Sequence, residues 1–138
     1  MKNYTTVLWN IIYYVLIIFF SYTVTNKFLA VKSFQTNIFK TGIFNFQQVV
    51  YFSYFVLLLE ASLVLLLIFK KKVGLLFSFL MMLIFTSYII FLYTTGRYEI
   101  CECGGILNGL SFKYHLIINL LITFLSYCTY NNFKTDEK

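Results

Sequence analysis

Four long apolar runs, separated by short islands of charge, constrain this chain more than any other feature. The runs cover residues 7–25, 49–69, 73–93 and 115–130. With a rise of about 1.5 Å per residue, helices of this length cross most or all of a hydrocarbon core about 30 Å thick. The chain is 60% hydrophobic and 12% charged, too little charge for the surface of a water-soluble domain. We therefore predict an all-α, polytopic membrane protein: one membrane domain, residues 1–138, built as a four-transmembrane-helix bundle.

The formal net charge of +6 does not indicate nucleic-acid binding. The eleven Lys and Arg residues are spread over all the predicted loops and form neither a basic stripe nor a nucleic-acid motif. The first apolar run follows Lys2, as in a signal peptide, but no small-x-small cleavage site follows Phe20. We expect this run to be retained as the first helix.

Three consecutive lysines, residues 70–72, form the whole connection between the second and third runs. A connection this short makes the two helices antiparallel neighbours. Because cationic residues in short loops resist translocation, this dense cluster predicts that the connection and both termini are cytoplasmic. We expect a multi-pass protein of a bacterial inner membrane. The cations then assigned to the outer loops are Lys27, Lys32, Lys40, Arg97 and Lys113.

The outer segment 26–48 is too long and too aromatic for a plain connector. Phe34 and Ile38 lie one helical turn apart, and polar residues occupy the other faces. This half-apolar pattern predicts a short interfacial helix at the outer membrane surface, between the first two spans. Ser33 is its expected N-cap and Gly42 its expected end.

The segment 94–114 holds the only concentrated chemistry in the sequence. It contains Cys101 and Cys103, and on this topology it lies outside the cytoplasm, where thiols are oxidised. A disulfide between residues i and i+2 closes a very small ring, and strain makes such a bond oxidising. We therefore predict that the two cysteines are a catalytic redox pair. Arg97 favours a thiolate electrostatically, whereas the two neighbouring glutamates oppose it.

Other interpretations of these cysteines stay open. A disulfide that only staples the segment, or two inert thiols, explains the Cys-x-Cys spacing about as well. A metal site that adds His115 has less support, because the paired Cys-x-x-Cys pattern of common zinc sites is missing, and no metal is expected. Cys128, toward the inner end of the fourth run, is expected to be a small core residue.

Glu60 lies in the middle of the second apolar run, where an ionised carboxylate costs about 2.5–3.5 kcal/mol on insertion scales. We expect it to face the bundle interior, as a proton acceptor or quinone contact, or as a hydrogen-bonded tie between helices. The candidate partners of such a tie are Asn10, Tyr13, Tyr14 and Asn119.

His115 and Asn119 are one turn apart on the fourth predicted helix and therefore share a face. We expect this face to line an interior path beneath the cysteine segment, with His115 as a further candidate catalytic residue. His115 also suits the role of an interfacial anchor.

At these positions the chain resembles the MauE / DoxX-like family of small, redox-associated, four-helix membrane proteins. The likeness is carried by Glu60, Arg97, Cys101, Cys103, Gly104, Gly105, Leu110, Ser111, Phe112, His115 and Asn119. The resemblance implies a periplasmic thioredoxin-like partner, since MauE is linked to forming or maintaining disulfides in a secreted subunit of methylamine dehydrogenase. By analogy with disulfide-generating membrane proteins, a quinone is the candidate electron acceptor.

The sequence thus leaves two classes of function. In the first, Cys101 and Cys103 exchange electrons with a thioredoxin-like protein or a secreted thiol substrate, and a quinone serves as the membrane acceptor. In the second, the protein is a non-catalytic membrane anchor or assembly subunit of a larger complex, and its disulfide only shapes a docking loop.

Overall fold

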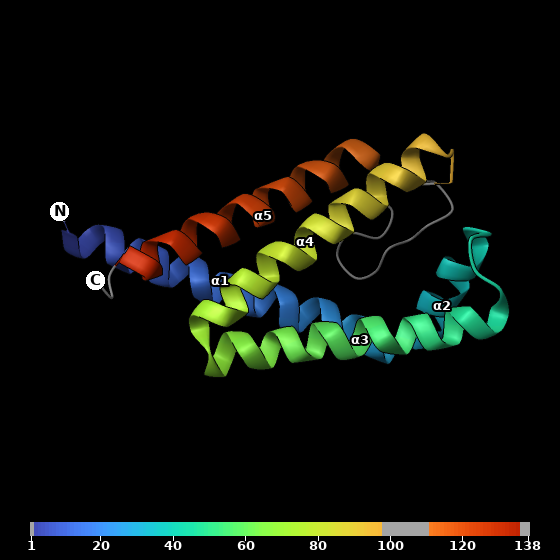
Figure 1. The fold of residues 1–138 in the computed structure, drawn as a ribbon, viewed down its shortest axis with the longest axis horizontal. Coiled ribbons are helices and arrows are strands. Elements are labelled where there is room, and N and C mark those ends of the chain that lie inside the picture. The colour runs from blue at the N-terminus through green and yellow to red at the C-terminus, as the bar shows by residue number, and fades with distance from the viewer. Residues whose placement is uncertain (1, 98–110, 136–138) are drawn as a thin grey trace.

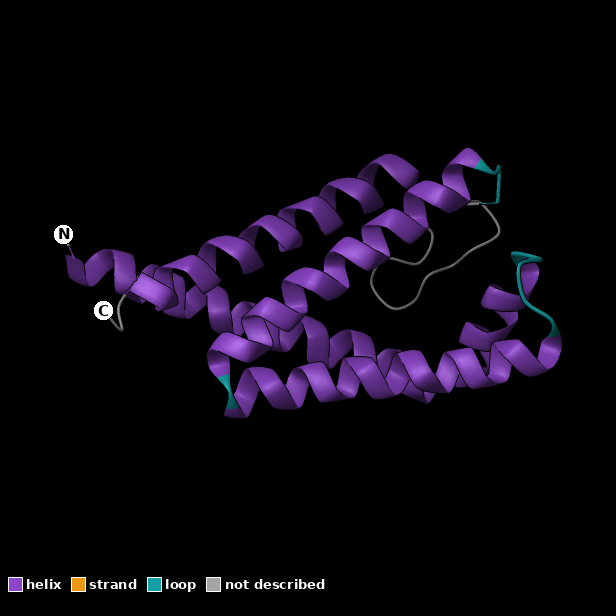
Figure 2. Cartoon of the chain, viewed as in Figure 1, coloured by secondary structure: helices purple, strands orange, loops and turns teal. Residues whose placement is uncertain are grey.

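The computed structural model describes residues 2–97 and 111–135, and nearly all of them are helical (Figures 1 and 2). The helices are α1 Lys2–Leu29, α2 Val31–Lys40, α3 Phe46–Phe69, α4 Lys71–Thr94 and α5 Phe112–Thr135. The all-α class is therefore confirmed. Among the described residues, three helices are long and apolar enough to cross a membrane: α1 over Asn3–Leu29, α3 and α4.

The helices are longer than the apolar runs that predicted them. α1 continues to Leu29 instead of ending at residue 25, and α5 begins at Phe112 instead of residue 115. α5 has 24 residues, as α3 and α4 do, but its composition is more polar, and it is not among the three apolar helices. The fourth membrane crossing therefore stays a prediction.

The helices α1, α3, α4 and α5 form a four-helix bundle (Figure 1). α4 packs most extensively on α5 and then on α3, and α1 closes the ring between α3 and α5. The start of α1, the end of α5 and the α3–α4 turn lie at one end of the bundle, and α2 lies against α3 at the other. The two ends therefore differ: one carries the termini and the tight turn, and the other carries α2.

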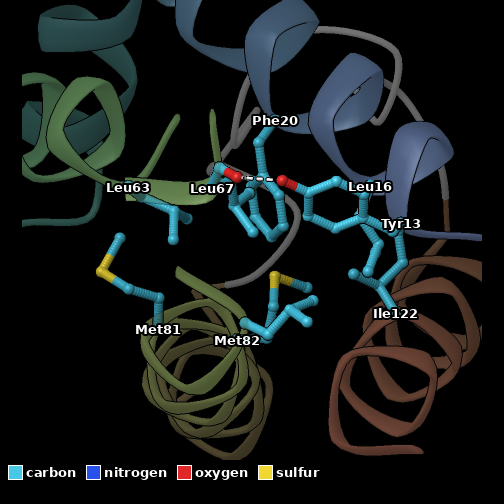
Figure 3. Close-up of a cluster of buried hydrophobic side chains, with 9 residues drawn as sticks. Tyr13, Leu16, Phe20, Leu63, Leu67, Met81, Met82 and Ile122 are labelled. Atoms are coloured by element: carbon cyan, nitrogen blue, oxygen red, sulfur yellow. Dashed lines mark hydrogen bonds between the residues drawn. The ribbon is translucent and has the colours of Figure 1, made fainter. Parts of the chain in front are cut away.

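An apolar core joins the four long helices (Figure 3). It consists of Tyr13, Leu16, Phe20, Leu63, Leu67, Leu75, Met81, Met82 and Ile122. Tyr13 donates its hydroxyl proton to the carbonyl of Leu67. Because Leu67 lies in the last turn of α3, its carbonyl receives no hydrogen bond from the helix backbone, and the Tyr13 hydroxyl supplies one instead.

Lys70 alone separates α3 from α4, so the expected antiparallel pair is confirmed. The next lysine of the cluster turns into the bundle. The Nζ atom of Lys71 donates to Oδ1 of Asn10 over 3.1 Å and lies 3.3 Å from the centre of the Phe133 ring. Lys71 thus ties α4 to α1 and α5 as well as marking the turn.

The short helix α2 lies within the segment where the sequence predicted one, but its start differs. Ser33 lies inside the helix, and the N-cap is Ala30, which makes no side-chain capping bond. The predicted Ser33 cap is wrong because α1 continues to Leu29, which leaves only Ala30 between the helices. The expected end is confirmed, since Gly42 follows the C-cap with φ +67, a left-handed conformation that glycine adopts without steric cost.

Asn45 caps the start of α3. Its Oδ1 accepts from the Gln48 backbone N–H, and its own backbone N–H donates to Gln48 Oε1, both over 3.0 Å. We expect Asn45→Ala to lower the free energy of unfolding by about 1 kcal/mol, because a backbone donor loses its acceptor. Detergent-induced unfolding followed by circular dichroism measures this. Asn45→Asp keeps the capping oxygen and should stay close to wild type; equal losses in both variants would show that capping is not the cause.

Candidate functional site

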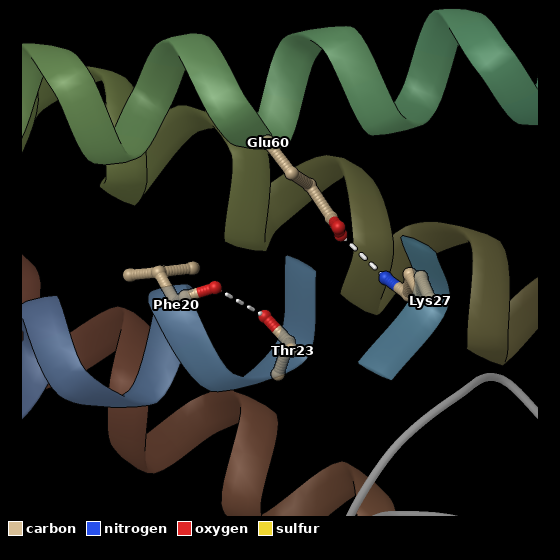
Figure 4. Close-up of polar contacts among 4 residues, drawn as sticks. All are labelled: Phe20, Thr23, Lys27 and Glu60. Carbon is tan, nitrogen blue, oxygen red and sulfur yellow. Dashed lines mark hydrogen bonds and ion pairs between the residues drawn. The ribbon is translucent and has the colours of Figure 1, made fainter. Parts of the chain in front are cut away.

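A buried ion pair joins α1 to α3. Lys27, in the last turn of α1, donates from Nζ to Oε1 of Glu60 over 2.5 Å (Figure 4). The two side chains are 9% and 2% exposed. The helices run antiparallel (Figure 1). Because a helical side chain leans toward the N-terminus of its own helix, Lys27 and Glu60 lean toward each other and meet inside the bundle.

Two aromatic rings flank the ammonium group of Lys27. The ring centre of Phe34 in α2 lies 5.5 Å from Nζ, and that of Phe85 in α4 lies 5.4 Å from it. Both distances are within the range of about 6 Å over which a cation is attracted to a ring face. The charge of Lys27 is therefore balanced by a carboxylate and two ring faces.

The ion pair forms part of the wall of a cavity of about 420 Å³, to which all five helices contribute. Small-molecule sites commonly measure about 300–1,000 Å³, so the cavity has the size of a ligand site. The polar residues of the wall are Thr23, Lys27, Asn37, Glu60, Tyr88, His115 and Asn119. The rest is apolar, and its phenylalanines are Phe19, Phe20, Phe34, Phe52, Phe55 and Phe85.

The second carboxylate oxygen of Glu60 is a buried acceptor. In residues 2–97 and 111–135, no group donates a hydrogen bond to Oε2. A buried polar atom without a partner costs about 1–3 kcal/mol. This oxygen is therefore a natural contact for a ligand that carries a hydrogen-bond donor.

His115 and Asn119 lie in the same cavity wall as Glu60. Each is 3% exposed, and they come from the first two turns of α5. The structure thus brings together three residues that the sequence singled out from two different helices. His115 faces the bundle interior, so the interfacial-anchor alternative is wrong.

Glu60 does not pair with any of the residues that the sequence suggested as partners. It pairs with Lys27, which the sequence placed in a loop. Asn10 bonds to Lys71, Tyr13 bonds to Leu67, and Tyr14 is 62% exposed. Lys27 is buried because α1 continues to Leu29, beyond the end of the apolar run at Thr25.

A signal for Lys27 was present in the sequence. The buried residues of α1 include Tyr13, Leu16, Phe20, Thr23 and Lys27. Their spacing of three and four residues keeps them on one helical face. Extending the buried face of the first helix past Thr25 would have placed Lys27 inside the bundle.

Arg97 lies three residues after the end of α4, in the turn that closes the helix. Gly96 takes φ +70, its N–H donates to the Tyr93 carbonyl over 3.1 Å, and the Arg97 N–H donates to the Leu92 carbonyl over 2.8 Å. This pair of bonds is the Schellman motif that closes many helices. Cys101 and Cys103 lie outside the described residues, so the redox pair and the electrostatic role of Arg97 stay predictions.

Two other predictions concern Cys128 and metal binding. Cys128 is a half-buried free thiol on α5. Within the part of the chain that the structure describes, no group of three His, Cys, Asp or Glu side chains is placed to hold a metal ion. The cavity is therefore the chemically distinctive feature of the described residues.

Three apolar helices, a helical bundle and a buried polar site define a polytopic membrane protein with an internal cavity. Comparison with protein families gives a match over residues 5–130 to the methylamine utilisation protein MauE family. The chain belongs to this family. No curated protein and no solved structure matches it. The matched range contains all the residues that carried the resemblance, and the link to DoxX proteins stays a prediction.

Proposed function

We propose that this protein exchanges disulfides with a thiol protein outside the cytoplasm, using Cys101 and Cys103 as its redox pair. The observation that carries the proposal is the position of the cysteine segment in the chain. It joins the end of α4 to the start of α5, and both ends contribute to the polar cavity through Tyr88 and His115. Membership of the MauE family supports a role in methylamine utilisation.

The proposed exchange moves two electrons. A partner thiolate attacks one sulfur of the Cys101–Cys103 disulfide and breaks that bond, and the second partner thiol then resolves the mixed disulfide. The partner loses two electrons and two protons as its own disulfide forms, and this chain gains them as two thiols. A thioredoxin-like protein or a secreted thiol substrate fits this role, and the same balance holds in the opposite direction.

Renewal of the disulfide requires an acceptor for two electrons and two protons. A membrane quinone suits the purpose, because its two carbonyl oxygens each gain a hydrogen as it becomes a quinol. The cavity supports this choice, since it combines aromatic walls with the buried polar groups of Glu60 and Lys27.

We also propose that α5 is the fourth membrane span. Its buried residues are mostly polar and face the bundle: His115, Asn119, Thr123, Ser126 and Thr129. Large apolar residues cover the opposite side: Ile117, Leu120, Leu121 and Phe124. Lipid contact on one side and a polar interior on the other is the arrangement expected of a membrane helix with polar residues.

We propose that the chain is oriented in the membrane with both termini on the cytoplasmic side. The lysine turn and both chain ends share one end of the bundle, and the cytoplasmic side suits this cationic end (Figure 1). α2 then lies at the outer surface of a bacterial inner membrane, as an interfacial helix beside the cavity.

Trapping of mixed disulfides tests the redox role. Cells expressing Cys101→Ser, Cys103→Ser or the double variant are quenched with acid, alkylated and analysed on non-reducing gels. One single variant should accumulate a reducible adduct, because in the reverse direction its remaining thiol attacks the partner's disulfide and the second cysteine of this chain, which would resolve the adduct, is missing. The double variant should form none. Cys128→Ser is the matched control and should behave as wild type.

The result that contradicts the redox role also identifies the alternative. If the double cysteine variant forms the same assemblies and supports full function, the protein is a membrane anchor or assembly subunit. Its exposed aromatic side chains, among them Tyr51, Phe69 and Phe124, would then be the surface that contacts the larger complex.

A further inference from the structure

We propose that the cavity is a binding site for a lipid-soluble quinone that enters from the bilayer between α3 and α4. The Lys27–Glu60 pair is the polar end of this site. The inference rests on the proposed function, in which the cysteine pair needs an electron acceptor within the membrane. The quinone would bind in the cavity, contact Lys27 and Glu60, and enter from the bilayer.

The polar end offers both a donor and an acceptor. An ammonium group has three N–H donors, and Glu60 Oε1 takes one from Lys27. Oε2 of Glu60 is buried, and in the described part of the chain nothing donates to it. A quinone carbonyl can accept from Lys27, and a quinol hydroxyl can donate to Oε2. Both redox states of the ligand therefore find a partner.

The ion pair also selects the charge of the ligand. The Lys27 and Glu60 charges lie 2.5 Å apart and compensate each other, so the polar end has no net charge. A charged head group would bring in a charge that neither member of the pair is left to compensate. A neutral ligand with oxygen substituents fits, and a fatty acid or an ammonium compound does not.

The rest of the wall suits a flat ring with an apolar tail. Phe34 and Phe85 flank Lys27, and Phe19, Phe20 and apolar side chains such as Leu59 and Met82 extend the wall. Aromatic rings pack on one another in offset or edge-to-face geometry, which is favourable for a quinone ring as well.

The proposed mouth of the cavity lies between α3 and α4. Phe55 of α3 and Ile84 of α4 both line the cavity, yet they are 56% and 64% exposed. The two helices are in closest contact near Gly74 and separate toward the other end of the bundle (Figure 1). The mouth is apolar, so a ligand dissolved in the bilayer can pass through it without leaving an apolar environment.

Equilibrium binding of radiolabelled short-chain ubiquinone and menadione to the full chain in lipid nanodiscs tests this site. We expect saturable binding at one site per chain. Ile84→Trp fills the mouth and should weaken binding at least about tenfold. Leu83→Trp, an equal enlargement at an exposed position outside the cavity, should leave affinity unchanged. The same ligands are also measured in their chemically reduced quinol forms. Glu60→Gln should weaken binding of the quinol more than that of the quinone, because an amide with one acceptor oxygen replaces the carboxylate.

The outcomes separate this inference from the proposed function. Binding is measured again in the Cys101→Ser/Cys103→Ser double variant, where it should be unchanged. Uptake no greater than that of empty nanodiscs, or equal affinity in Ile84→Trp and Leu83→Trp, overturns the quinone site even if disulfide exchange is observed. A tightly held phospholipid that neither quinone displaces also overturns it. Quinone binding without any cysteine exchange would instead contradict the proposed function.

Discussion

Replacing Lys27 with methionine should lower the free energy of unfolding by about 3–5 kcal/mol, the cost of leaving one member of a buried ion pair uncompensated. Glu60 is 2% exposed and has Lys27 as its ion-pair partner, so its charge would lose the contact that balances it. The measurement is detergent-induced unfolding of the purified protein, followed by circular dichroism.

The control for this variant is Lys32→Met, which removes an exposed lysine of the neighbouring helix α2 and should change stability little. A second comparison isolates the pair itself. The double variant Lys27→Met/Glu60→Met should recover most of the loss, because replacing a whole buried pair with apolar side chains is often neutral or stabilising. If the double variant is as unstable as the single one, the loss comes from packing of the lysine stem and not from the unpaired charge.

We propose that the pair has a role beyond holding the helices together. Apolar side chains of similar size can join two membrane helices without bringing charges into the bilayer, where each charge is costly. A Lys27–Glu60 pair in the wall of a cavity, with a carboxylate oxygen left over, is better explained by a ligand. We therefore favour a functional role for Glu60 over a purely structural tie.

Gly74→Ala should also destabilise the protein, by about 1–3 kcal/mol, because an added methyl group has no room. A Cβ atom at this position would lie 2.5 Å from the backbone nitrogen of Leu67 and 2.6 Å from its Cα. Backbone atoms of α3 cannot move aside as a flexible side chain can. The two helices would have to separate just after their one-residue turn.

The direction of the change in stability distinguishes Gly74 from an ordinary helical glycine. At an ordinary helical position, glycine to alanine stabilises a helix by about 1 kcal/mol. A loss of stability at Gly74, measured by thermal unfolding in detergent, would therefore identify the close contact between α3 and α4. Ser87→Ala on the exposed side of α4 is the control and should have little effect. Unchanged or greater stability in Gly74→Ala would show that the helices do not approach this closely.

Much of the architecture could be predicted from the sequence because it depends on local patterns. Apolar runs longer than buried strands predicted the long helices, and the lysine cluster predicted the turn between α3 and α4. Gly42 marked the end of α2, since its left-handed conformation favours glycine. The shared face of His115 and Asn119 followed from helical periodicity alone.

The candidate site could be predicted only in part, because its contacts join distant segments. Glu60 was expected in the interior, but its partner Lys27 precedes it by 33 residues and was assigned to a loop. Hydropathy falls at Asn26 and Lys27, so hydropathy alone ends the helix too early. The three-and-four spacing of the buried face points to Lys27, and the packing of α1 on α3 confirms that this face continues. Ser33 failed as an N-cap for a related reason, since the true start of α2 depends on where α1 ends.

The sequence by itself determined a helical membrane chain with one interior carboxylate and one cysteine-rich segment. The tertiary structure decided which charge balances Glu60 and that side chains from all five described helices line a common cavity. The physical reason is that hydropathy and helical periodicity act over a few residues. A buried charge, by contrast, is stabilised by whichever group the packed helices bring within hydrogen-bonding distance.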